Sequence, residues 1–399
     1  MEIRKLKKEE LFEAFKIAAY CFHMRLEDPE QERANVESDT NDSWGAFDEN
    51  GRMMAKIINN RYTFYIDGKA VKTGGIGGVS TLPEYRDRGA VKEIFKELLR
   101  DAYRDGEVIS TLYPFNHEFY RKAGYETVTY LNEYTFSAPV LRPYRFSGEV
   151  CRWNTGDPVT DFLTVYNSFA PEYNLMMARS EENMLEHMKV KKEYIDRKFS
   201  YVLKQGGKPA AYVIFTDIRH DPAPVLKVEE CAWTGRDGFY AILGFLARFT
   251  ADYGEIKLPL PVGIDLLRII QSPLAYDVQK YTGQSFMVRT VNAKKLLETV
   301  AKPAGCDFTV KVSDEIIEEN NRIFRVKSDS VEELKDPSAD DYIMASADIE
   351  LSCRALGQMA IGAVNFDEAL LRRDVTLNGN EDILRRVFTE KKIFVGEHF

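Results

Sequence analysis

The sequence has few of the residues that hold disulfide-linked or metal-bound proteins together. It contains five cysteines and five histidines in 399 residues. The cysteines form no Cys-x-x-Cys pair and stand apart, at Cys21, Cys151, Cys231, Cys306 and Cys353. No histidine has the spacing of a metal ligand. The odd, dispersed cysteines predict reduced thiols in a cytoplasmic protein, and the histidines predict that it has no metal site.

Long apolar runs and an excess of positive charge are also missing. No stretch approaches the length of a membrane span, and Met1 is followed by a charged segment where a signal peptide would be apolar. The net charge of −9 at pH 7 argues against a nucleic acid as principal partner and is compatible with cationic substrates. We therefore predict a cytoplasmic protein without a membrane span. Its 399 residues, 44% of them apolar, are enough for two or three domains.

A strand, a basic turn and an amphipathic helix follow one another over residues 74–102. After the turn, which holds Arg86 and Arg88, apolar residues recur on one helical face: Val91, Ile94, Phe95, Leu98, Leu99 and Ala102. Gly106 stands where a glycine would end this helix. The free N–H groups of the first helical turn favour an anion, the arginines add charge, and Gly89 puts no Cβ in its way. The pattern predicts an anion site, with an ordinary capped surface turn as the alternative.

Two familiar phosphate motifs are absent from this region. No Gly-Lys-Ser/Thr follows a glycine loop, which excludes a P-loop. The glycines at 74–78 lie before the strand and not after it, which excludes a dinucleotide fingerprint. Downstream, residues 107–113 predict a buried strand and residues 116–124 a short helix that ends at a glycine. Tyr120 lies in that helix. It is either a functional residue or a core tyrosine whose hydroxyl has a hydrogen-bond partner.

Together these segments resemble the GNAT acetyltransferases. Motif A of that family reads Arg/Gln-x-x-Gly-x-Gly/Ala, and residues 86–91 match it except that Val91 replaces the usual small residue. Residues 119–125 are similar to the family's aromatic-Tyr-x-x-x-Gly-Tyr/Phe run, whose tyrosine approaches the thioester sulfur. The resemblance implies acetyl-CoA as cosubstrate. The residues that it implies in binding are Val79, Ser80, Thr81, Arg86, Asp87, Arg88, Gly89, Ala90, Val91 and Asn116.

The remaining residues predict two further units. Strands and one helix are expected in an order that echoes the first unit, at 201–216, 225–233, 237–252 (the helix) and 255–261. From residue 284 onwards, short strands and helices look like a sterol-carrier-protein-like α+β domain. We predict two tandem GNAT-type α/β domains followed by this α+β domain. The expected domains are 1–140, 141–283 (a degenerate copy) and 284–399.

This domain order is similar to that of the Eis (enhanced intracellular survival) acetyltransferases. The resemblance implies that the α-carboxylate of Phe399 is the catalytic base, that Tyr120 is the general acid, and that the protein forms a homo-oligomer, a hexamer as in the family. These roles make chemical sense. An ammonium with a pKa of about 10 must lose a proton before its nitrogen attacks a thioester. A carboxylate can accept that proton, and a tyrosine can protonate the departing thiolate.

The resemblance implies that the acceptor is an amine of a small molecule or a peptide, since the family acetylates aminoglycosides and lysine-bearing peptides. Seven carboxylates within residues 24–42 are able to attract such a cation or to form a solvated helix face: Glu27, Asp28, Glu30, Glu32, Glu37, Asp39 and Asp42. Glu397 would add negative charge near the chain end. Two other functions stay open. One is the transfer of a longer acyl chain, and the other is a non-catalytic scaffold that binds coenzyme A or a lipid.

Overall fold

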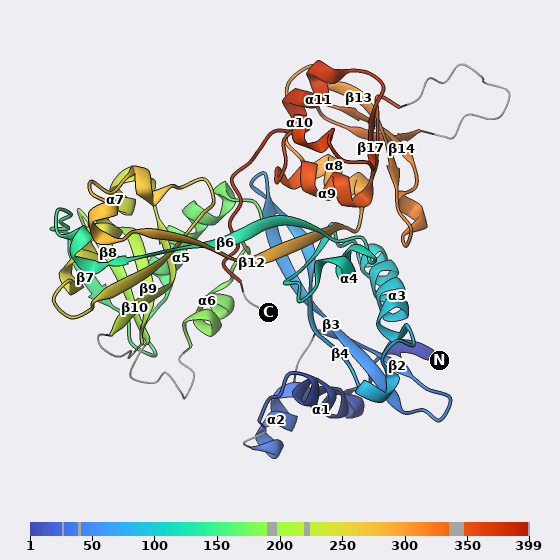
Figure 1. Ribbon diagram of the computed structural model, residues 1–399, viewed down its shortest axis with the longest axis horizontal. Coiled ribbons are helices and arrows are strands. Elements are labelled where there is room, and N and C mark those ends of the chain that lie inside the picture. Colours follow the sequence, from blue (N-terminus) through green and yellow to red (C-terminus); the bar gives the residue numbers. More distant parts are fainter. Residues whose placement is uncertain (26–27, 39–40, 190–197, 219–223, 335–346, 398–399) are drawn as a thin grey trace.

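The computed structural model describes all residues except 26–27, 39–40, 190–197, 219–223, 335–346 and 398–399. Strands of the described residues form one sheet of twelve strands and one of five. Figure 1 shows three units: an N-terminal one in blue and teal, a middle one in green and yellow, and a C-terminal one in orange and red. The predicted combination of α/β and α+β architecture is confirmed.

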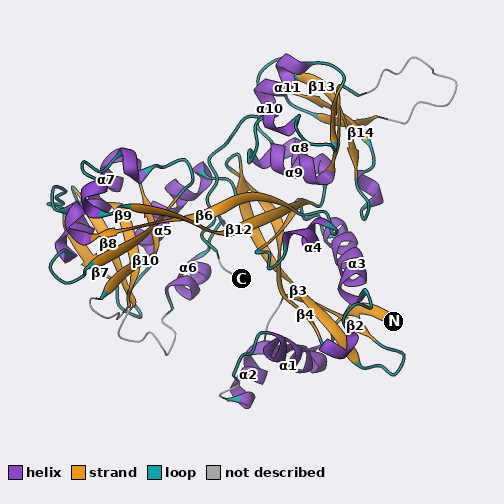
Figure 2. Ribbon diagram, in the orientation of Figure 1, coloured by secondary structure: helices purple, strands orange, loops and turns teal. Residues whose placement is uncertain are grey.

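The first unit forms one end of the large sheet. Its strands are β1 (Glu2–Lys5), β2 (Asp42–Phe47), β3 (Met53–Ile66), β4 (Lys69–Thr81) and β5 (Ile109–Leu112). Its helices are α1 (Leu11–Cys21), α2 (Pro29–Glu37), α3 (Ala90–Arg104) and α4 (His117–Arg121). The first four strands pair antiparallel in order, and β4 pairs parallel with β5. Met53 packs with α1 and its neighbour Met54 with α3, so these helices cover opposite faces of the sheet (Figure 2).

The helix expected after the basic turn is α3. Its six apolar positions are all buried, as the periodicity predicts: Val91, Ile94, Phe95, Leu98, Leu99 and Ala102. Gly106 follows the helix with a φ of +80°, a conformation that favours glycine. The short helix expected near residue 120 is α4, and Gly124 follows it with a φ of +87°.

The second unit repeats the strand order of the first. Its strands are β7 (Glu149–Arg152), β8 (Lys198–Gln205), β9 (Lys208–Ile218), β10 (Val225–Trp233) and β11 (Glu255–Leu260). Its helices are α5 (Thr160–Phe169), α6 (Glu181–Met188) and α7 (Gly235–Leu246). As in the first unit, four strands pair antiparallel in order and the fourth pairs parallel with the fifth. The single strand expected over 201–216 is a hairpin, because Gly206 and Gly207 turn the chain between β8 and β9.

Two long strands join these units by a reciprocal exchange. β6 (Glu126–Ser137) follows the first unit, and its C-terminal half pairs with β11 of the second. β12 (Gln279–Thr290) follows the second unit, and its C-terminal half pairs with β5 of the first. The two strands also pair with each other and cross between the units in Figure 1. The boundary expected at residue 284 therefore falls inside a strand of the large sheet.

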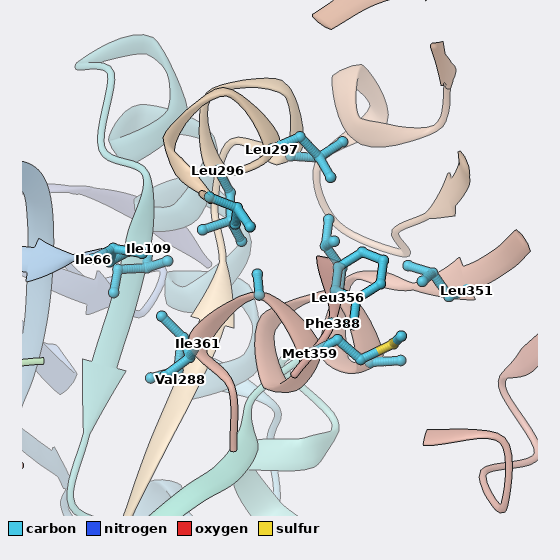
Figure 3. Packing of buried hydrophobic residues seen from close by; sticks show 14 of the residues in the cluster. Ile66, Ile109, Val288, Leu296, Leu297, Leu351, Leu356, Met359, Ile361 and Phe388 are labelled. Carbon is cyan, nitrogen blue, oxygen red and sulfur yellow. The ribbon is translucent and has the colours of Figure 1, made fainter. Parts of the chain in front are cut away.

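The third unit holds the small sheet, and its helix at residues 353–361 packs between this sheet and the large one. Its strands are β13 (Asp307–Ser313), β14 (Ile323–Lys327), β15 (Val331–Leu334), β16 (Ile349–Ser352) and β17 (Val375–Leu377). Its helices are α8 (Ala293–Thr299), α9 (Cys353–Ile361), α10 (Phe366–Ala369) and α11 (Glu381–Val387). In Figure 3, Leu356 and Met359 of α9 lie among side chains of the third unit, while Ile361 reaches Val288 of β12. One continuous core thus fixes the third unit to the first.

The part of the chain that the structure describes contains neither a membrane-spanning helix nor a disulfide bond. Its helices are all too short or too polar to cross a membrane. All five cysteines belong to this part, and each is a free thiol. Three of them, Cys231, Cys306 and Cys353, are buried in the cores of the units.

Candidate active site

The predicted basic turn lies between β4 and α3, and it leaves the N-terminus of α3 uncapped. Gly89 is the N-cap residue with a φ of +77°, no side chain caps the helix, and a Cβ on this glycine would meet open space. Arg86 and Arg88 are exposed, and neither has an ion pair within the described residues. The Arg88 guanidinium lies over the Tyr85 ring, 5.2 Å from its centroid. The helix N-terminus and two arginines that lack a carboxylate partner in the described part of the chain thus belong to the same turn, where they favour an anion.

The other residues of the motif shape the turn and attach it to the core. Asp87 has a φ of +63°, so two left-handed residues close the turn tightly. Ala90 and Val91 are buried and pack in the core under α3. Because the Val91 side chain points into this core, its replacement of a smaller residue puts no bulk into the turn.

β4 and β5 separate at the end of the sheet that faces this turn. Their parallel pairing covers only residues 73–75 of β4, whereas β4 continues to Thr81. Within the described residues, Val79, Ser80 and Thr81 therefore have β3 as their sole neighbouring strand. A bulge at Gly78, whose φ is +54°, redirects the backbone at the same place. The open edge of β4 is able to pair with amide groups of an extended ligand.

Tyr120 lies in α4, with its ring buried against α3. Its ring meets that of Phe95 edge to face, with centroids 6.1 Å apart. Burial raises the pKa of the Tyr120 hydroxyl, which is therefore protonated at neutral pH. Among the described residues, none is a hydrogen-bond partner of this hydroxyl, which is also not one of their fully buried unpaired atoms. Asn116, expected to bind cofactor, caps α4 by accepting the Phe119 N–H at 3.0 Å.

A groove of about 220 Å³ lies between α3 and α4. Its lining combines three lysines with apolar side chains and two residues of the third unit: Lys92, Phe95, Lys96, Phe119, Lys122, Ala123, Glu315 and Ile316. Two of these lysines pair with neighbouring carboxylates, Lys96 with Glu93 and Lys122 with Glu118. A larger cavity of about 1140 Å³ lies between the units, but neither the basic turn nor Tyr120 lines it.

The last described residues return from the third unit to the separated end of β4 and β5. Figure 1 shows this segment, residues 388–397, as a red trace that runs between the first two units. Tyr113, directly after β5, donates a hydrogen bond to the carbonyl oxygen of Glu397 at 2.6 Å. Glu397 Oε1 accepts from Arg179 Nε at 2.7 Å. Phe399, the predicted base, lies outside the described residues.

Arg179 and Glu230 form a buried ion pair that the sequence did not single out. Two parallel hydrogen bonds join them, Nη1 to Oε1 at 2.8 Å and Nη2 to Oε2 at 2.7 Å. Burial alone would raise the pKa of Glu230, but Arg179 and His187 outweigh it and hold this pKa well below its usual value. β10 also carries Lys227 and Glu229, but of its three charged residues only Glu230 is buried, and a buried carboxylate needs a partner. Nothing local identifies Arg179 as that partner.

The acidic segment at 24–42 lies next to the end of β4, because Cys21 of α1 donates a hydrogen bond to the Thr81 carbonyl oxygen at 3.4 Å. Asp28 caps α2, and Asp42 pairs with Lys5 and Arg61. These two carboxylates therefore serve the fold. The others divide into residues on α2 (Glu30, Glu32 and Glu37) and two outside the described residues (Glu27 and Asp39).

Family models match both ends of the chain. Residues 2–128 match the acetyltransferase (GNAT) domain, and residues 293–396 match the sterol carrier protein domain. None of the curated proteins matches the sequence.

Solved structures share the fold over the whole length. A GCN5-related N-acetyltransferase from Anabaena variabilis ATCC 29413 is 18% identical, with a TM-score of 0.84 and 100% of both chains covered. A conserved protein of unknown function from Enterococcus faecalis V583, described as a probable N-acyltransferase, is 21% identical, with a TM-score of 0.84, 98% of this chain and 97% of its own covered. Eis1 from Mycobacterium abscessus is 19% identical, with a TM-score of 0.79 and 100% of both chains covered.

Proposed function

This chain carries a GNAT acetyltransferase domain at its N-terminal end and a sterol carrier protein domain at its C-terminal end, and from that premise we propose that it is an acetyl-CoA-dependent N-acetyltransferase of amines. One observation supports this above all. The uncapped N-terminus of α3, the open edge of β4 and the buried Tyr120 meet at one end of the sheet. An anionic thioester with an extended amide-bearing arm fits that arrangement.

In this proposal the pyrophosphate of coenzyme A lies at the basic turn. Arg86 and Arg88 supply charge-assisted hydrogen bonds, and the N–H groups of residues 89–91 point at the phosphate oxygens. Backbone groups of Val79 and Thr81 pair with the amides of the pantetheine arm. The groove between α3 and α4 accepts the nucleotide end, whose phosphate suits its lysines.

The proposed base is the α-carboxylate that Phe399 carries when it ends the chain. Two residues span at most about 7 Å in extended form, and Glu397 is already fixed beside the end of β5. The carboxylate would therefore stay near the separated strands. There it accepts a proton from the acceptor ammonium, directly or through water, and the freed nitrogen lone pair attacks the acetyl carbonyl carbon.

The proposed acid is Tyr120. As the carbon–sulfur bond breaks, its hydroxyl gives a proton to the departing thiolate, and its raised pKa keeps that proton in place beforehand. A backbone N–H near Val79 would stabilise the carbonyl oxygen while negative charge develops on it. Acetyl-CoA supplies the activated acetyl group, and the side chains named here move the protons.

The acceptor class is an amine such as an aminoglycoside, a polyamine or a lysine side chain. Transfer of a longer acyl group is the second candidate, since the Enterococcus faecalis relative is described as a probable N-acyltransferase. A thiol-release assay over an amine panel, run with acetyl-, octanoyl- and myristoyl-CoA, separates the two. Release with acetyl-CoA supports the proposal, and release with the long-chain thioesters alone contradicts it. Coenzyme A binding without release on any amine would instead favour the scaffold.

We also propose that the protein assembles as a homo-oligomer, a hexamer in its full form. Three units in one chain offer large surfaces for self-association. Light scattering at micromolar concentration measures the mass directly. A monomer mass of 45.8 kDa would contradict the proposal.

A further inference from the structure

The segment after α11 contacts all three units, and the second unit holds it through Asn174 and Phe169. The backbone of Asn174 pairs with it on both sides, accepting from the Phe394 N–H at 3.1 Å and donating to the Lys392 carbonyl at 2.8 Å. The Phe394 ring packs edge to face against Phe169 of α5, with centroids 6.3 Å apart. These contacts hold residues 392–394. The residues after Val395 need a further contact to fix their course.

Arg179 sets that direction. Its side chain is fully buried, with 0% exposed, and it contacts the carboxylates of Glu230 and Glu397 at once. The planar guanidinium has a rigid set of donors, so it is able to hold both carboxylates in fixed orientations. Its face lies over the Tyr166 ring, 4.4 Å from the centroid. The cation thus has little freedom to follow a moving partner.

Glu230 is itself fixed, which makes the arrangement rigid from the core outwards. Tyr212 donates a hydrogen bond to Glu230 Oε1 at 2.5 Å, and His187 Nε2 lies 3.1 Å from Oε2. Tyr212 is completely buried in the core of the second unit. A chain of contacts therefore runs from this core through Glu230 and Arg179 to Glu397.

Glu397 is held from the opposite side as well. Its carbonyl oxygen accepts the Tyr113 hydroxyl at 2.6 Å, and Tyr113 packs edge to face on Phe286 of β12, with ring centroids 4.9 Å apart. The side chain of Glu397 is therefore bound by the second unit, and its backbone is bound by the first. This residue is clamped between the two units at the end of β5.

We propose that the second unit serves as an anchor for the C-terminal segment through Arg179, and that Arg179, together with Tyr113 of the first unit, positions the residues that follow Glu397. The inference rests on the proposed function in that these last residues carry the base. In this inference the second unit, the degenerate copy of the first, contributes to the reaction of the first unit by positioning the base. Arg179 touches no reacting atom, and it acts by fixing the position of Glu397.

The test compares Glu397→Ala with Glu390→Ala in the full chain. Glu390 is an exposed carboxylate on the same segment without an ion pair in the described residues, so it controls for lost charge. Removing the Glu397 side chain leaves the Arg179–Glu230 pair intact and avoids an unpaired buried charge. A second variant, Arg179→Ala with Glu230→Gln, removes the cation while neutralising its buried partner.

Three readouts are needed. The first is the rate at which carboxypeptidase trims the terminus, followed by mass spectrometry. The second is the melting temperature, and the third is kcat and KM in the thiol-release assay. We expect Glu397→Ala and the double variant to be trimmed at least tenfold faster. Their kcat should fall at least tenfold, with KM for acetyl-CoA within twofold of native. Glu390→Ala should match the native protein in all three, and Glu397→Gln, which still accepts from Arg179, should recover part of the loss.

The outcomes separate the anchor from the proposed function. Unchanged trimming in Glu397→Ala, or faster trimming with native kcat, overturns the anchor while the acetyltransferase proposal stands. A native protein that releases no thiol on any amine overturns the acetyltransferase proposal. In that case trimming still reports whether Arg179 holds the segment.

Discussion

The rings of Tyr120 and Phe95 meet at an interplanar angle of 88°, with centroids 6.1 Å apart. Phe95 belongs to α3, whose N-terminus is the proposed pyrophosphate site, and Tyr120 belongs to α4. The contact therefore sets the distance between the phosphate end of the cofactor and the hydroxyl proposed to protonate its sulfur. Both rings lie in one core cluster with Tyr125.

Tyr120→Phe should lower kcat by roughly 10²- to 10⁴-fold, since it removes the proposed general acid. Affinity for acetyl-CoA should stay within twofold, because the ring and its contact with Phe95 remain. Tyr125→Phe is the matched control. It removes a buried hydroxyl that bonds Ser110 Oγ at 2.7 Å, and it should cost about 1 kcal/mol of stability with little loss of kcat. Equal kcat losses in the two variants would contradict the assignment.

Arg86→Ala combined with Arg88→Ala should weaken coenzyme A binding by about 1–3 kcal/mol, the usual range for lost charge-assisted hydrogen bonds. Isothermal calorimetry measures the change. Arg104→Ala is the control at the other end of α3, where the arginine pairs on the surface with Asp101 at 3.1 Å. It should leave affinity unchanged. Native affinity in the double variant would move the phosphate site away from this turn.

Glu107 should make stability depend on pH. Asn59 Nδ2 donates to Glu107 Oε1 at 2.8 Å, while Asn59 Oδ1 and Glu107 Oε2 are buried without a hydrogen-bond partner in the described residues. A protonated Glu107 is able to donate to Asn59 Oδ1 and so satisfy both oxygens. Burial raises the pKa of Glu107 to about 7 from a usual 4.5.

Because the folded pKa lies above the unfolded one, the protonated form stabilises the fold below pH 4.5. That stabilisation is lost as pH rises through about 7. Glu107→Gln keeps both hydrogen bonds at every pH. Between pH 5 and 8, the native protein should therefore lose on the order of 3 kcal/mol relative to this variant. Urea unfolding at the two pH values measures the difference, and parallel pH profiles would refute the raised pKa.

Local patterns predicted the elements that build the site. The apolar periodicity from Val91 to Ala102 and the glycine at 106 specify α3 almost to its ends, because helix burial follows a 3.6-residue repeat. Local residue types also predicted the basic turn, from Arg86, Arg88 and Gly89, and α4, from the glycine that follows it. The structure adds that Asn116 caps α4 and that Val91 points into the core, and both facts depend on the direction of a side chain.

The sheet partners of β6 and β12 and the partner of Glu230 could not be predicted. A strand's neighbour depends on contacts between distant segments, so the short strands expected after residue 284 did not indicate that β12 belongs to the large sheet. Arg179 lies 51 residues from Glu230 and 218 from Glu397. No spacing rule joins such positions, whereas the three-dimensional fold brings them within hydrogen-bonding distance.

The most direct measurement compares thiol release from acetyl-CoA by the native chain and by a chain with several residues added after Phe399. The extension turns the α-carboxylate into a neutral amide that accepts no ammonium proton. We expect turnover to be lost, at least a hundredfold, with the same melting temperature and the same calorimetric affinity for coenzyme A. Cleaving the extension through an engineered protease site after Phe399 should restore the native rate. Native turnover in the extended protein, with its fold intact, would contradict the account and require a side chain as the base.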